Sequence, residues 1–130
     1  MIGTITSEQS ISVPVTGMQL ITTTGLLECK LFVTSNSAFE TYTALLTSPV
    51  LGPGQFRRAI ATASLAGIGY QQAAATTGGS FQCLIRKVTA QLDDESGRIE
   101  LAVEVQVDAT AALSSLISVG FQVTTTAVTA

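Results

Sequence analysis

Residues 81–108 read FQCLIRKVTAQLDDESGRIELAVEVQVD and form the best-specified element of the chain, a β-hairpin. From Ile99 to Val107 every second residue is apolar, which is the period of a half-buried strand. A turn through Asp94–Gly97 sets Asp93 opposite Arg98. The same register joins three apolar pairs across the two arms: Leu92 with Ile99, Ala90 with Leu101, and Val88 with Val103. It also sets Lys87 against Glu104 on the other face, so a single register satisfies both faces of the hairpin.

The alternation of the first arm inverts before Lys87, where the apolar set becomes Phe81, Cys83 and Ile85. One extra residue explains such an inversion, so we expect a β-bulge at Arg86-Lys87. Each arm has about 11 residues and would span about 36 Å. A typical strand spans about 17–20 Å, so this hairpin must cross the whole domain or project from it.

The N-terminal third also favours strands. Ser10–Thr16 alternates, and Pro14 predicts an edge strand because proline donates no ladder hydrogen bond. Gly17 offers a turn, and Gln19–Thr24 continues as a strand up to a bend at Gly25. In the stretch that follows, Leu26–Thr34, one face is apolar: Leu27, Cys29, Leu31 and Val33. At the other end, Ser118–Thr129 predicts a last strand, after a segment at Thr110–Ile117 that suits a helical turn.

Two helices are expected in the middle of the chain. Ser37 and Glu40 have the spacing of a capping box, apolar residues follow at helical spacing, and Pro49 ends the pattern. Gln55–Ala75 predicts a second helix, with a stripe formed by Phe56, Ile60, Ala63 and Gly67, and Thr76–Ser80 as its exit loop. The small residues of this stripe suit either a contact between subunits or packing on the helix's own sheet.

These elements predict one domain, residues 1–130, of the α+β class. Its two central helices would pack on one face of a mainly antiparallel sheet, in the order β-β-β-α-α-β-β-β. No apolar stretch reaches the 18 residues of a membrane-spanning helix. Met1–Thr6 lacks the basic and apolar regions of a signal peptide, so we expect a cytoplasmic or virion-associated protein.

Composition restricts the chemistry. The 130 residues contain no histidine, which excludes a Ser-His-Asp triad and imidazole metal ligands. Cys29 and Cys83 are too far apart in the sequence for a zinc or redox pair. They could form one disulfide in an oxidising compartment, but both lie in apolar stretches, so free thiols are favoured. No catalytic residue, cofactor or metal site is predicted.

Charge is scarce, at 12% of residues with a net charge of −3. The centres of protein interfaces are depleted in charge, so this composition favours self-assembly into a homo-oligomer.

Three local clusters have alternative interpretations. Asp93, Asp94 and Glu95 would suit a divalent cation, but such a site needs about six oxygen ligands, and a solvated hairpin turn is favoured. Gly52-Pro53-Gly54 and Gly78-Gly79 lack phosphate-loop spacing and indicate connectors. The candidate phosphate contacts are the two adjacent basic pairs, Arg57 with Arg58 and Arg86 with Lys87. Nucleic acid is therefore a conceivable partner but is not favoured at this net charge.

Three functional hypotheses follow. The favoured one is a structural subunit of a shell, tube or ring, in general character like virion and phage-tail proteins. It would act through strand edges and apolar interfaces, with candidate interface residues Ile11, Val13, Val15, Val119, Phe121 and Val123. The second is a small-ligand binding module with a pocket between helices and sheet, lined by Phe39, Tyr42, Phe56 and Tyr70. The third is a histidine-free enzyme that uses a thiol or two carboxylates, such as Glu40 and Asp108.

Overall fold

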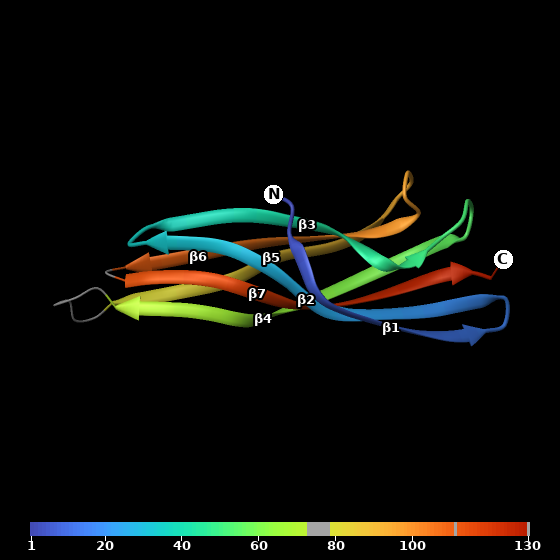
Figure 1. Ribbon diagram of the computed structural model, residues 1–130, viewed down its shortest axis with the longest axis horizontal. Helices are drawn as coiled ribbons and strands as arrows, with labels where there is room; N and C mark the ends of the chain where they lie inside the picture. Colours follow the sequence, from blue (N-terminus) through green and yellow to red (C-terminus); the bar gives the residue numbers. More distant parts are fainter. Residues whose placement is uncertain (73–78, 111, 130) are drawn as a thin grey trace.

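Seven long β-strands make up the computed structural model, which describes residues 1–72, 79–110 and 112–129 (Figure 1). No helix occurs in those ranges. The strands are β1 (Thr4–Val15), β2 (Met18–Thr34), β3 (Ser37–Val50), β4 (Phe56–Gln72), β5 (Ser80–Asp93), β6 (Arg98–Thr110) and β7 (Ala112–Val128). The predicted α+β class is therefore wrong, and the described chain is all-β.

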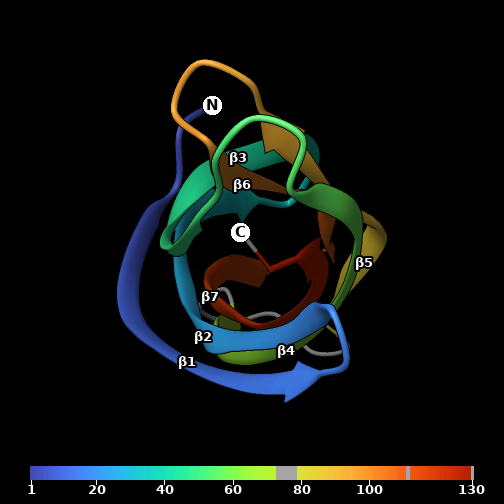
Figure 2. The ribbon, with the colours of Figure 1, turned by 90° about the vertical axis from the view of Figure 1, so that its right-hand side faces the viewer.

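The strands form two antiparallel sheets that pack against each other. One has four strands in the order β1-β2-β7-β4, and the other has three in the order β3-β6-β5. Seen along its length, the strands of the two sheets surround one core, and β1 lies on the outside (Figure 2). The chain changes sheet four times, after β2, β3, β4 and β6, so the two sheets are interleaved in sequence.

The hairpin of β5 and β6 has the predicted register. Asp93 lies opposite Arg98, all three apolar pairs form as expected, and Lys87 faces Glu104. The register shifts between Ile85 and Lys87, which places the bulge at the predicted point. The turn is held by Asp93, whose carboxylate accepts hydrogen bonds from the Ser96 amide at 3.2 Å and the Ser96 hydroxyl at 2.6 Å. The acidic cluster is thus the hairpin turn that the sequence favours.

The core lies between the two inner faces. The three-stranded sheet contributes the whole apolar face of β6, with Ile99, Leu101, Val103, Val105 and Val107 all fully buried. The four-stranded sheet contributes the alternating apolar residues of β2, namely Leu27, Cys29, Leu31 and Val33, together with the inward face of β7. The alternation predicted for Leu26–Thr34 is confirmed, and Pro14 lies in β1, which is an edge strand as expected.

The first predicted helix is strand β3. Ser37 and Glu40 form no capping box, because they lie in an extended strand. The apolar residues of this segment fit the helical period as well as the strand period. In the strand, the inward residues are Ala38, Tyr42, Ala44 and Leu46. Strand β6 is the central strand of its sheet and needs a neighbouring strand at each edge. Strand β3 is one of these neighbours and pairs Tyr42 with Val103. Pairing with β6 therefore outweighs the local preference of this segment for a helix.

The second predicted helix is strand β4, as far as Gln72; residues 73–75 and most of the predicted exit loop lie outside the described residues. The alanines that suggested a small helical face instead point inward at every second position. Ala61 pairs with Val123, and Ala63 pairs with the larger Phe121. Small side chains on β4 leave room for the bulky inward residues of β7. The alanines here therefore reflect packing between strands and do not indicate a helix.

Strand β7 is longer than predicted and lies elsewhere in the sheet. It begins at Ala112, so a strand replaces the helical turn expected over Thr110–Ile117, with residue 111 outside the described residues. It lies between β2 and β4, at the centre of the four-stranded sheet. The prediction that Val119–Val128 offers a free edge is therefore wrong.

Candidate functional site

Charge is distributed unequally between the two sheets. The three-stranded sheet carries one charged residue in β3, three in β5 and four in β6. The four-stranded sheet has more residues, yet carries one in β1, two in β2, two in β4 and none in β7. Both charged residues of β2 pair with each other, because Lys30 Nζ lies 3.3 Å from a Glu28 oxygen. The three-stranded sheet is therefore richer in charge than the four-stranded sheet.

The outer face of the four-stranded sheet is built from cross-strand rows of aliphatic, threonine and glutamine side chains. The central row runs Ile11, Thr22, Thr124 and Ile60 across the four strands. The rows on either side run Gln9, Thr24, Gln122, Thr62 and Val13, Leu20, Thr126, Arg58. We call these positions, without Arg58, the uncharged face.

The aliphatic side chains of the uncharged face are well exposed. The exposed fractions are 61% for Ile11, 52% for Val13 and 51% for Ile60. Val15, next on the same face of β1, is 50% exposed. Single exposed aliphatic residues are ordinary, whereas a set that shares one charge-poor face is typical of an interaction surface.

The predicted interface residues divide into two groups. Ile11, Val13 and Val15 lie on this exposed face, at the edge strand. Val119 and Val123 are fully buried and Phe121 is 5% exposed, because β7 is central and these residues point into the core. They contribute to stability and are not accessible to another subunit. Sequence reasoning missed Leu20. It placed Ile60 on a helical stripe suited to a subunit contact, whereas Ile60 reaches this face from strand β4.

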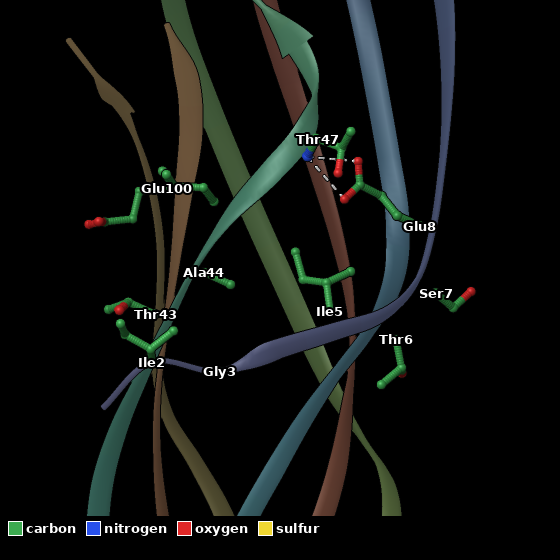
Figure 3. A pocket seen from close by; sticks show the side chains of 11 residues that line it. Ile2, Gly3, Ile5, Thr6, Ser7, Glu8, Thr43, Ala44, Thr47 and Glu100 are labelled. Atoms are coloured by element: carbon green, nitrogen blue, oxygen red, sulfur yellow. Dashed lines mark hydrogen bonds between the residues drawn. The ribbon is translucent and has the colours of Figure 1, made fainter. Parts of the chain in front are cut away.

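An open groove of about 550 Å³ lies between the first half of β1 and strand β3 (Figure 3). Ile5 and Ala44 lie along it, and Glu8 stands at one end. The Glu8 carboxylate accepts hydrogen bonds from the Thr47 amide at 3.0 and 3.1 Å and from the Ser48 amide at 3.1 Å. Glu8 thereby ties the edge of one sheet to the edge of the other.

The first three residues cover another part of the β3 edge. The Gly3 amide donates to the Thr43 carbonyl at 2.7 Å, and the Thr43 amide donates to the Met1 carbonyl at 3.0 Å. Ile2 forms a parallel bridge with Thr43 while its side chain is 86% exposed. Met1–Gly3 therefore holds β3 by backbone hydrogen bonds rather than by side-chain burial. We call Met1–Gly3 the N-terminal strap.

Replacing Glu8 by alanine is expected to lower the free energy of unfolding by about 1–3 kcal/mol, because two backbone amides lose a charged acceptor. Chemical denaturation measures this loss. Glu28→Ala is the matched control: its ion pair with Lys30 is at the surface and is worth at most about 1 kcal/mol. Equal losses in the two variants would contradict the structural role of Glu8.

The four predicted pocket residues do not come together. The pocket was expected between helices and sheet, and no helix is present in the described residues. Tyr42 is buried in the core, and Phe56 packs against the core from β4. Phe39 lies on the outer face of the three-stranded sheet with the Arg86 guanidinium 5.6 Å from its ring centre. Tyr70 stacks on Phe81 at a centroid distance of 4.6 Å, joining β4 to β5.

The two basic pairs lie on different sheets. Arg57 and Arg58 open β4, and Arg57 donates to the Gly54 and Phe56 carbonyls at 2.9 and 3.1 Å. Arg86 and Lys87 lie on β5, where Arg86 donates to Gln106 at 2.6 Å. The guanidinium groups of Arg57 and Arg86 thus donate to oxygens of the protein itself.

The carboxylates named for an enzyme lie on the three-stranded sheet: Glu40 on β3, and Asp108 on β6 opposite Ser37. Hydrogen bonds from Ser37 and Gln106 lower the pKa of Asp108, which favours its charged form. Among the described residues, no group of three or more Cys, Asp or Glu is placed to hold a metal ion.

Both cysteines are free thiols, as expected. Burial, reinforced by the charge of Glu28, raises the pKa of Cys29 to about 11, and burial also raises the pKa of Cys83. A raised pKa keeps a thiol protonated at neutral pH, so neither cysteine has the thiolate character of a nucleophile. Gly52–Gly54 is the connector between β3 and β4.

Neither a membrane-spanning helix in the described residues nor a known relative points to a function. Within the described ranges, no helix is long and apolar enough to span a membrane. In the comparisons with known proteins, no family model, curated protein or solved structure matches this chain.

Proposed function

We propose that this protein is a structural subunit that assembles with copies of itself through the uncharged face and the edge strand β1. The observation that carries the proposal is the segregation of charge: β7 has no charged residue, whereas β6 in the opposite sheet has four. The three-stranded sheet, which is richer in charge, keeps one side of the subunit hydrated. Self-association would then bury the charge-poor side, as interface centres are depleted in charge.

The dimensions of the four-stranded sheet support this role, with the uncharged face as one part of its outer surface. Strands β2, β4 and β7 have 17 residues each. At about 3.3 Å per residue and about 4.8 Å per strand, three such strands cover roughly 800 Å². A stable protein interface buries about 800 Å² on each partner, so one face of this sheet has the area that a specific contact needs.

Two copies of this face are compatible with each other. The central row offers Ile11 and Ile60 flanking two threonines, so face-to-face packing would bring apolar and hydroxyl groups together without opposing like charges. Arg58 lies at the rim of the face, where charge is tolerated. Repetition of such contacts would build the shell, tube or ring suggested by the composition.

Ile60→Glu is expected to abolish every species larger than a dimer, because it places a charge in the face at a position 51% exposed in the subunit. Light scattering on a sizing column gives the mass. Val50→Glu is the matched control, since Val50 is 64% exposed on β3 and lies opposite Arg98. We expect it to keep the wild-type mass.

The first test of the proposal is the mass of the wild-type protein. We expect it to elute as an assembly of many 13.4 kDa chains and to show regular particles in negative stain. A wild-type protein that stays at the mass of a single chain at all concentrations would overturn the proposed function. So would an assembly whose mass Ile60→Glu and Val50→Glu reduce equally.

A further inference from the structure

The sandwich has four strand edges, and in the described residues three of them are covered over at least part of their length. The β4 and β5 edges are in contact, joined by the stacked rings of Tyr70 and Phe81. The β3 edge is covered at Thr43 by the N-terminal strap and at Thr47–Ser48 by the Glu8 carboxylate. Covering an edge in this way prevents it from pairing with another chain.

The edge of β1 has no such cover over Gln9–Val15. It also lacks the charges that usually protect an edge strand, since no charged residue occurs between Glu8 and Glu28. Figure 1 shows β1 on the outside of the sheet, reaching to the end of the molecule with β2. This is the edge at which a further strand would be added.

Pro14 shows which backbone groups of β1 face outward. A proline in a ladder occupies a position whose missing N–H would point away from the partner strand. Hydrogen-bonded and outward-facing positions alternate along an antiparallel strand, so Ser12 and Ser10 also direct their N–H and C=O groups outward. The outward edge thus offers donors at Ser10 and Ser12, and Pro14 limits its length.

We infer that β1 pairs with β1 of a second copy of this chain, antiparallel and around a two-fold axis, which joins two four-stranded sheets into one of eight strands. The inference rests on the proposed function and specifies its smallest unit. The partner is a second copy because the segment is uncharged and pairs with itself without repulsion. Since the other edges are covered, edge pairing closes at two subunits, and larger assemblies grow through the uncharged face.

Proline replacement tests the edge separately from the face. In the Ile60→Glu background we expect a particle of twice the chain mass. Adding Ser12→Pro removes an outward donor that the β1–β2 ladder does not use, and should reduce this particle to a single chain of 13.4 kDa. Ser12→Ala keeps the backbone donor and is the matched control, for which the dimer should persist.

The outcomes separate the two proposals. If the wild type assembles and Ser12→Pro leaves the Ile60→Glu dimer intact, the edge pairing is overturned. Self-assembly through the uncharged face would still stand. An Ile60→Glu protein that is already a single chain would overturn the edge pairing too, whereas a monomeric wild type would overturn both the edge pairing and the proposed function.

Amide hydrogen exchange on the Ile60→Glu dimer checks the edge pairing without a proline variant. The Ser10 and Ser12 amides should be protected there, and rapid exchange at both would contradict the inference.

Discussion

Val103→Asp is expected to abolish folding. Val103 is fully buried at the centre of the three-stranded sheet, between Tyr42 on β3 and Val88 on β5. A carboxylate there loses its hydration at a cost of several kcal/mol, and the apolar burial lost is worth about 1.5–3 kcal/mol more. A domain of this kind has a total stability of about 5–15 kcal/mol, so the substitution removes most or all of it.

Circular dichroism and thermal unfolding measure the effect of Val103→Asp. Ala102→Asp is the matched control, because the neighbouring residue points to the outer face between Thr43 and Thr89. We expect the control to remain soluble and to unfold cooperatively. A Val103→Asp protein with a cooperative transition near that of the wild type would contradict the packing of β6.

Gly25→Ala is expected to destabilise the protein by about 3 kcal/mol, at the upper end of overpacking effects. A Cβ at this position would overlap the Ser7 carbonyl oxygen of β1 and lie 2.8 Å from the Phe121 ring. The β1 backbone comes this close because the register shifts between Ile5 and Ser7. For a domain of this size, such a loss corresponds to a fall in Tm of roughly 10 °C.

The control for Gly25→Ala is the same change at Gly120 in the neighbouring strand. A Cβ there would meet the Ser64 hydroxyl at 3.4 Å, a contact that this side chain can relieve. Alanine reduces the entropy of the unfolded chain, so we expect Gly120→Ala to be neutral or stabilising by up to about 1 kcal/mol. Similar Tm values for the two variants would argue against the close approach of β1 to Gly25.

The sequence predicts strands reliably where two independent constraints agree. In the hairpin, the apolar alternation and the opposed charges of Lys87 and Glu104 select the same register, and the structure has it. In Ser37–Val50 no second constraint was present. Helical and strand periods both fit this segment. The apparent capping residues Ser37 and Glu40 favoured a helix, and this prediction is wrong.

The candidate site was predicted in part. Alternation and Pro14 identified β1 as an exposed edge with Ile11, Val13 and Val15 on one face. The same pattern in Val119–Val123 was interpreted in the same way, yet β7 is the central strand. Alternation shows that one face of a strand is buried, but it does not show how many neighbours the strand has.

The features that could be predicted from the sequence are local: the period of each clear strand, the hairpin register, the turn at Asp94–Gly97, and the scarcity of charge. That β3 and β4 are strands follows from tertiary packing, because their inward residues gain burial only against β6 and β7. Tertiary packing also decided the order of strands in each sheet, and with it which side chains share an outer face. Ile11 and Ile60 are 49 positions apart, and only a sheet in the order β1-β2-β7-β4 places them in one row. Pairing between distant strands depends on the combined burial of the whole core, which no single segment of the chain encodes.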